Sequence, residues 1–265
     1  MKNYLLISIL FVLTLSSCEE EISLNSNFTK HFTIYSTEKG RTYPIWVQLP
    51  EDYNQNTELY STIYVLDADD NQEYVAKCAK DASTRLKTKN VIVVGIGYGD
   101  DRTVDYTPTH TNMGGGESPI FLDFINNELI PKIQTDFRAD TSRNSRVILG
   151  HSFGGLCGAY AFTKRNEIFG NYLMLSASLF YDNDLMIQYE QESRPQIHNE
   201  QQLVYIGAGG TEGPLLVDND LLHLRLKSYF YTQTKTTFQI IEGKGHNASK
   251  NPNIKKAINF YFQNR

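Results

Sequence analysis

The sequence comprises 265 residues with a formal net charge of -5 and a pI near 5.7. This length favours one large α/β domain over several small ones. Lysine and arginine form no block, which argues against a nucleic-acid partner, because phosphate binding needs clustered cations.

The N-terminal residues 1–17 have the pattern of an export signal, in which Lys2 precedes an apolar run that ends at Leu15. The run is too short to span a bilayer comfortably. Cys18 follows a leucine and two serines, and this tetrapeptide resembles the lipobox of bacterial lipoproteins. We therefore expect an exported chain whose acylated Cys18 anchors it to a bacterial membrane, on the periplasmic or cell-surface side of the outer membrane. An ordinary signal peptide with a nearby cysteine is the alternative.

The segment after this cysteine, residues 18–30, is polar and is predicted to tether the lipid to a single folded domain, residues 31–265. Cys78 and Cys157 lie in helical patterns and lack the spacing of a metal site or a disulfide framework. We expect both to be small core residues.

The folded domain is expected to begin with an antiparallel hairpin. Residues 31–36 and 43–50 each alternate apolar with polar or small residues, and the turn between them contains Gly40. Continuous apolar runs, typical of strands buried on both faces, follow at residues 61–67, 90–97, 145–150, 171–177, 202–209 and 236–243. Helical patterns lie between most of them, at residues 71–87, 119–133, 154–165, 221–230 and 253–263. This alternation predicts an α/β fold with a mostly parallel central sheet and helices on both faces.

Catalytic side chains are expected beyond the carboxyl ends of these strands, where open parallel sheets bind their ligands. The segment "GHSFGG", Gly150–Gly155, joins a predicted strand to a predicted helix, which is the context of a nucleophile elbow. Ser152 is therefore the candidate nucleophile, and the start of the helix offers the N–H of Phe153 to an oxyanion. The segment after the first parallel strand offers a second donor, from the backbone of Ala68 or Asp69.

The general base and the acid are expected after the nucleophile, in the order serine, acid, histidine. Three histidines follow at a distance: His198, His223 and His246. The first lies in a polar loop and the second in a helical pattern, whereas His246 lies in a glycine-rich loop after the last strand. Glu212 follows the preceding strand and is the candidate that orients His246. Asp218 and Asp220 fit the start of a helix as caps, although either remains an alternative acid, as does a Ser–His dyad.

Arg102 lies in the loop beyond the strand at residues 90–97, at the expected ligand edge. Its guanidinium either orients an anionic or polyhydroxylated substrate or pairs with Asp105 to hold its own loop. Three nearby acids, Asp67, Asp69 and Asp70, are interpreted as turn and cap residues, because no further ligands are spaced to complete a cation site.

From about Thr33 onward, the chain resembles the esterase family of α/β-hydrolases that includes the ferric enterobactin and salmochelin esterases. The similar segments are "IWVQLPEDYN", "YVLDADD", "GHSFGGL", "LSASLFYDND" and the stretch with Arg102, Asp105, Thr107 and Pro108. Ala68 stands where the family usually has glycine. Ala177, Phe180 and Tyr181 replace a proline and two aromatic residues of the family.

The resemblance implies an ester hydrolase with the α/β-hydrolase fold that needs no metal or organic cofactor. It supports Ser152 and His246 as catalytic residues. The candidate substrate-binding residues are Arg102, Tyr106, His151, Phe180 and Tyr181.

The family's substrates range from catecholate siderophores to simple acyl esters, and related esterases remove acyl groups from polysaccharides. We therefore expect a serine esterase that acts through an acyl-enzyme on a siderophore-type ester or another natural ester, either small or linked to a glycan. A carbohydrate acetyl or feruloyl esterase and a non-catalytic ligand-binding lipoprotein are the alternatives.

Overall fold

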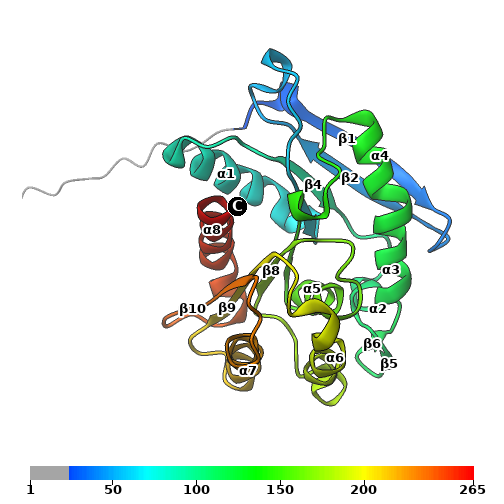
Figure 1. The fold of residues 1–265 in the computed structure, drawn as a ribbon. Coiled ribbons are helices and arrows are strands. Elements are labelled where there is room, and N and C mark those ends of the chain that lie inside the picture. The colour runs from blue at the N-terminus through cyan, green and yellow to red at the C-terminus, as the bar shows by residue number, and fades with distance from the viewer. Residues whose placement is uncertain (1–23) are drawn as a thin grey trace, which may run out of the picture.

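An eight-stranded sheet forms the centre of the protein (Figure 1), in a computed structural model that describes residues 24–265. In chain order its strands are β1 (Thr29–Ser36), β2 (Arg41–Gln48), β3 (Thr62–Leu66), β4 (Ile92–Ile96), β7 (Arg146–His151), β8 (Asn171–Leu175), β9 (Gln202–Gly209) and β10 (Thr234–Ile241). Their order across the sheet is β1-β2-β4-β3-β7-β8-β9-β10. A separate short sheet joins β5 (His110–Thr111) to β6 (Gly114–Gly115).

The first two strands form the expected hairpin, which pairs antiparallel from Thr29 opposite Gln48 to Ser36 opposite Arg41. Gly40 has a φ of +65° in the turn, a backbone conformation that glycine adopts without strain. The pairing of β2 with β4 is also antiparallel, and the remaining neighbours in the sheet pair in parallel. The predicted sheet arrangement is therefore confirmed.

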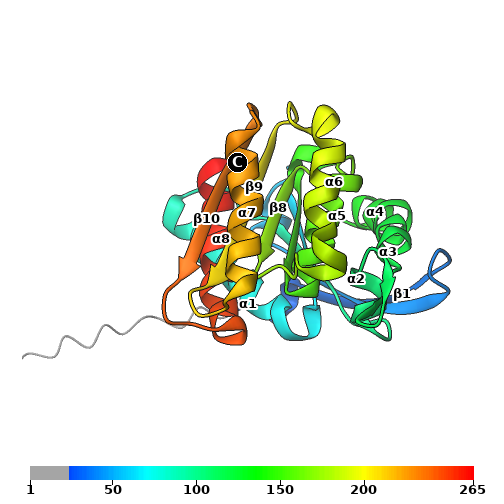
Figure 2. The ribbon, with the colours of Figure 1, turned by 90° about the horizontal axis from the view of Figure 1, so that it is seen from below.

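Helices cover both faces of the sheet, and for this reason β3, β4, β8 and β9 are buried along their whole length. They are α1 (Ala68–Leu86), α2 (Arg102–Tyr106), α3 (Ser118–Phe124), α4 (Ile130–Asp136), α5 (Phe153–Lys164), α6 (Tyr181–Ile197), α7 (Pro214–Ser228) and α8 (His246–Asn264), with a π-helical turn at Ile125–Leu129 between α3 and α4. In Figures 1 and 2, α1 and α8 lie on one face and α5, α6 and α7 on the other. Two apolar cores result, one on each side of the sheet.

The ordered domain begins before residue 31. A 3-10 turn at Ser26–Phe28 leads into β1, and the ring of Phe28 packs against the core. Residues 26–30 therefore belong to the folded domain, which corrects the predicted tether. The predicted signal peptide, residues 1–17, and Cys18 lie outside the described residues. Within residues 24–265, the helices are too short or too polar to cross a bilayer.

Three of the longer helices differ from the sequence prediction, as does the short α2, which lies where a loop was expected. The pattern does not predict α6, which is largely polar and contains Pro195. Because α7 begins at Pro214, Asp218 and Asp220 lie inside that helix and do not cap it, contrary to their predicted role. The last helix begins at His246, in the segment that was expected to be a loop.

The carboxyl ends of the parallel strands meet along one edge of the sheet. Asp67 follows β3, Ser152 follows β7 and Ser176 follows β8. Glu212 and His246 come shortly after β9 and β10. This edge therefore gathers the residues that the sequence singles out for catalysis.

Candidate active site

The turn between β7 and α5 holds Ser152 in a strained backbone conformation, with φ +61° and ψ -119°. The flanking glycines allow strand and helix to approach closely. A Cβ at Gly150 would collide with the carbonyl of Gly154, and one at Gly155 would lie 2.9 Å from the Cα of Ala177. Such a turn presents the serine hydroxyl at the top of the sheet, as a nucleophile elbow requires.

The hydroxyl side of this turn borders a hollow of about 370 Å³. Ser152, Glu212 and His246 line its polar side. Phe153, Phe180 and Leu215 line its apolar side. The hollow thus brings the predicted nucleophile, acid and base together beside an apolar wall that suits an acyl or aromatic group.

Glu212 accepts a hydrogen bond from His246, with 3.2 Å between Oε2 and Nδ1. Its other oxygen accepts from the hydroxyls of Ser176 and Ser249 and from the N–H of Gly209, at 2.8, 2.9 and 2.5 Å. Burial disfavours the charged carboxylate, but these hydrogen bonds together hold the pKa of Glu212 below its usual value. Glu212 is therefore an ionised acceptor that fixes the imidazole, with Nε2 left for the hollow.

The alternative acids do not share this geometry. Asp218 and Asp220 lie on α7, and the structure gives neither of them a hydrogen bond to the imidazole of His246. Burial and the nearby charge of Asp184 raise the pKa of Asp218, so its surroundings disfavour the ionised form that an orienting acid needs.

The predicted oxyanion donors lie at two helix starts, where backbone N–H groups have no acceptor within the helix. Phe153 opens α5 and Ala68 opens α1, followed by Asp69. The two starts are neighbours, because a Cβ at Gly154 would lie 3.3 Å from the carboxylate of Asp67. The side chains of Ala68 and Asp69 face a separate hollow of about 590 Å³, so only their backbone fits the predicted role.

Arg102 forms a bidentate ion pair with Asp67, at 2.7 and 2.8 Å, and also donates to the carbonyl of His151 at 3.3 Å. The expected alternative, a pair with Asp105, is wrong: that carboxylate binds Lys39 at 2.9 Å and accepts from a buried tyrosine hydroxyl. The guanidinium thus ties the segment after β3 to the end of β7 and is engaged by protein groups.

Two predicted substrate-binding residues are buried. Tyr106 is 2% exposed and its oxygen accepts from the N–H of Asp67. Tyr181 is 0% exposed and donates to the carbonyl of Thr109. Their burial contradicts a direct contact with substrate. Phe180, in contrast, is 42% exposed and lines the hollow.

His151 is also buried, at 7% exposure, and contacts the base instead of the hollow. Its Nε2 lies 3.1 Å from the carbonyl oxygen of His246, and the two rings are 4.5 Å apart between centroids. This placement corrects its predicted role as a substrate-binding residue.

The sequence prediction omits three serines near the catalytic residues. The hydroxyl of Ser178 lies 3.4 Å from that of Ser152 and lines the hollow, whereas Ser176 and Ser249 hold Glu212. A signal was available for two of them, because Ser176 and Ser178 come directly after β8, at the ligand edge.

The described residues, 24–265, contain no group of three His, Cys, Asp or Glu side chains arranged to hold a metal ion. Cys78 and Cys157 are free and buried, as predicted. The side chains and backbone N–H groups gathered around Ser152 are of the kinds that acyl transfer uses.

Comparisons with known proteins agree with this chemistry. The family model described as "Putative esterase" matches residues 36–246. Among curated proteins, the ferri-bacillibactin esterase BesA of Bacillus subtilis (strain 168) is 27% identical over 195 residues, which span 62% of this chain and 66% of BesA.

Two solved structures are similar over most of their length. The BES protein from Bacillus cereus has a TM-score of 0.79 at 23% identity, covering 91% of this chain and 97% of that one. An IroE-like serine hydrolase from Shewanella oneidensis has a TM-score of 0.75 at 26% identity, covering 89% and 80%. On the sheet order and these similarities, the fold is that of the α/β-hydrolases. Since the family match extends from the hairpin to the last strand's loop, the chain belongs to the "Putative esterase" family and is a carboxylic ester hydrolase.

Proposed function

We propose that the protein hydrolyses esters through an acyl-enzyme on Ser152, with His246 as general base and Glu212 as the acid that orients it. The observation that carries this proposal is the 3.2 Å hydrogen bond between His246 Nδ1 and Glu212 Oε2. Because an ionised Glu212 can only accept, this bond calls for the imidazole proton on Nδ1, which supports Nε2 as the atom that accepts the proton of Ser152.

The reaction then proceeds in two halves. Ser152 Oγ attacks the ester carbonyl while His246 takes its proton, and the resulting oxyanion accepts hydrogen bonds from the N–H of Phe153 and from the backbone at Ala68 or Asp69. The intermediate collapses, and the alcohol leaves with the proton held by His246. A water then gives its proton to the same imidazole and attacks the acyl-enzyme, which releases the acid and frees Ser152.

We further propose that the natural substrate is a siderophore-type ester. The similarity to the ferri-bacillibactin esterase BesA supports this class. The apolar wall of Phe153, Phe180 and Leu215 supports it as well, because aromatic acyl groups bury apolar area against such side chains. The assignment is tested by parallel assays on three substrate classes: ferric siderophore esters, acylated oligosaccharides and a short p-nitrophenyl ester. We expect the highest kcat/KM on a siderophore ester, and a preference for acylated sugars would overturn it.

The nucleophile is tested by labelling with a fluorophosphonate probe. We expect Ser152→Ala to abolish labelling and to lower kcat by about 10⁴-fold or more. Ser178→Ala is the matched control, because its hydroxyl lines the same hollow; it should retain labelling. Labelling that persists in Ser152→Ala would refute the acyl-enzyme.

The acid is tested by Glu212→Gln, which keeps the shape of the side chain but removes its charge. We expect kcat to fall by about 10²-fold or more with a smaller change in KM. Asp218→Asn and Asp220→Asn are the controls on α7. A larger loss of kcat in either control than in Glu212→Gln would reject Glu212 as the acid.

A further inference from the structure

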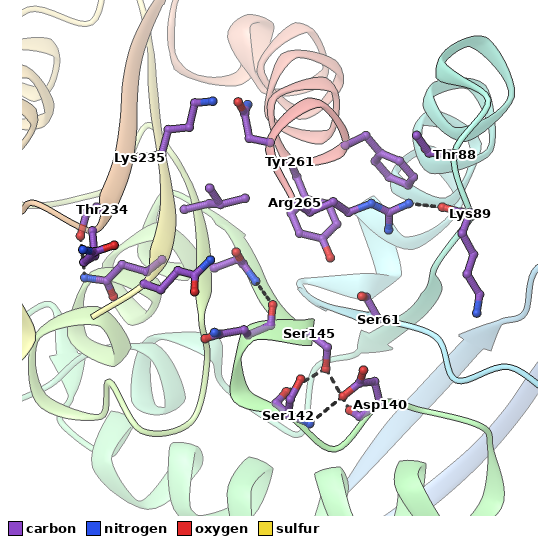
Figure 3. Close-up of a pocket in the computed structure, with 18 of the residues that line it drawn as sticks. Ser61, Thr88, Lys89, Asp140, Ser142, Ser145, Thr234, Lys235, Tyr261 and Arg265 are labelled. Atoms are coloured by element: carbon purple, nitrogen blue, oxygen red, sulfur yellow. Dashed lines mark hydrogen bonds between the residues drawn. The ribbon is translucent and has the colours of Figure 1, made fainter. Parts of the chain in front are cut away.

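A second hollow, larger than the one at Ser152, lies at the opposite edge of the sheet (Figure 3). Its volume is about 860 Å³. Most of its lining comes from segments at the amino ends of β3, β7, β9 and β10 and from the segment after α1. The C-terminal turn of α8 closes one side. His246 and Tyr261 lie on the same helix, 15 residues apart in sequence, so the two hollows are separated by about 22 Å along its axis.

Tyr261 contributes a phenol hydroxyl to this hollow. Its side chain is 1% exposed, yet its hydroxyl has no hydrogen-bond partner among residues 24–265. Some other fully buried tyrosines have partners: Tyr172 donates to the carbonyl of Phe169 at 2.7 Å, and Tyr205 donates to Asn253 at 3.0 Å. Figure 3 shows the hydroxyl of Tyr261 pointing into the hollow. The hydroxyl oxygen is not one of the fully enclosed polar atoms that lack a partner, so it opens onto the hollow, where it is available to a ligand.

Neutral polar groups surround this hydroxyl. Within the described part of the chain, the hydroxyls of Ser61 and Thr88 and the carboxamide of Gln233 have no side-chain hydrogen bond. Further carboxamides come from Asn90, Asn144, Asn171 and Asn264. Carboxamides and hydroxyls both donate and accept, as the hydroxyl groups of a sugar ring do.

The charged residues of the hollow are largely engaged with protein groups. Lys89 pairs with Glu58 at 2.6 Å, and Arg265 donates to the carbonyl of Lys89. Asp140 accepts from the N–H of Ser142 at 2.8 Å. Lys235 is exposed and stands at the rim. A neutral ligand therefore fits the lining better than an anion, which would need unpaired cations in the interior.

We propose that this hollow is a binding site for a neutral oligosaccharide. The unpartnered hydroxyl of Tyr261 and the carboxamides and hydroxyls around it form the hydrogen bonds to the sugar. Phe262 is only 3% exposed, so no aromatic face is open for stacking and the expected affinity is weak, with a Kd of about 1 mM. The site is independent of ester cleavage, because it lies at the other edge of the sheet from Ser152.

Binding is tested by ligand-observed NMR with unesterified oligosaccharides, which the active site does not turn over. The probes are xylohexaose and cellohexaose, with a hexagalacturonate as the anionic comparison. We expect saturation transfer to at least one neutral hexamer, and Tyr261→Phe should weaken its binding about 3- to 10-fold. Ser61→Ala should weaken it as well.

Tyr35→Phe on the exposed β1 is the matched control, and it should bind like the unchanged protein. Ser152→Ala should also bind normally, even though it is expected to lose activity. The proposal is overturned if neither neutral hexamer binds, if hexagalacturonate binds more tightly, or if both Tyr261→Phe and Ser61→Ala bind normally. Loss of binding in a Phe180→Ala variant would place the sugar in the catalytic hollow and would overturn it too.

Discussion

His151 stands directly before Ser152 and contacts His246. Burial, together with the neighbouring His246, lowers the pKa of His151 to about 4. The ring is therefore neutral near pH 7, and its Nε2–H donates to the carbonyl of His246. A neutral His151 places no positive charge beside the imidazole of His246. In the proposed mechanism it would therefore hold the base in place without opposing its protonation.

This depressed pKa makes stability depend on pH. The unfolded chain binds a proton at His151 below about pH 6.5, whereas the folded chain does so only near pH 4. The free energy of unfolding should therefore fall as the pH drops from 6.5 to 4, by up to about 3 kcal/mol from this residue. Urea unfolding at pH 7.5 and pH 5 measures the difference. In His151→Gln, which cannot titrate, the difference should shrink; an equal pH dependence in both proteins would contradict the assignment.

The structure brings Ser152, Glu212 and His246 together as the sequence predicts, but it places some of their predicted neighbours differently. The sequence suggests Glu212 and His246 because each follows an apolar strand at the ligand edge, although only β9 is buried along its whole length. Tyr106 and Tyr181 lie at similar positions, but their side chains turn inward to bond backbone groups. The position of a residue after a strand predicts the edge of the sheet on which it lies. It does not predict where the side chain points, because that depends on packing.

At the scale of elements, Arg102 on α2 joins the loop after β3 to the elbow after β7. Asp67 is 4% exposed, and burial raises its pKa despite the guanidinium beside it. Removal of Arg102 would leave a buried carboxylate without its partner, which typically costs about 3 kcal/mol or more.

We therefore expect Arg102→Ala to lower the free energy of unfolding by roughly that amount and to lower kcat/KM equally on neutral and anionic esters. Denaturant unfolding and assays on both ester classes test this, with Arg102→Lys as the variant that keeps the charge but loses the bidentate geometry. A loss of activity confined to anionic esters, at unchanged stability, would show that Arg102 binds substrate instead.

The element boundaries that the sequence missed have physical reasons. The apolar residues that α6 buries, such as Met186, are sparse in the sequence, and the helix also buries Glu190, which pairs with Arg194 on the same helix and Arg225 on α7. Such a pairing depends on tertiary contacts that local patterns do not contain. The first turn of α8 follows Gly245 and was hidden by the glycine-rich sequence before it.

For the whole molecule, the apolar strands and the elbow were enough to predict the α/β sheet and its catalytic edge, because strands buried on both faces have a strong sequence signal. The polar hollow at Tyr261 was not predicted. Its residues come from segments far apart in the chain, and none of them carries a motif.

We also propose that the mature chain begins at Cys18 and carries covalent lipid there. Several acyl chains would give stable membrane anchoring, which a single chain does not. Mass spectrometry of the N-terminal peptide from the native host should find an acylated Cys18, and Cys18→Ser should move the protein out of the membrane fraction. An unmodified N-terminus at another residue would reject the anchor.

The positive φ of Ser152 has a consequence for thermal stability. A non-glycine residue in this backbone conformation typically costs about 1–3 kcal/mol, and glycine would remove that cost. Glycine also makes the unfolded chain more flexible, which lowers the free energy of unfolding by roughly 0.5–1 kcal/mol and offsets part of the gain. Ser152→Gly should therefore melt a few degrees above Ser152→Ala, although both lack the hydroxyl. Differential scanning calorimetry of the two inactive proteins measures this gap, and equal melting temperatures would mean that the turn is held without strain. The same fold with glycine at position 152 is thus expected to be more thermostable than the protein with Ser152.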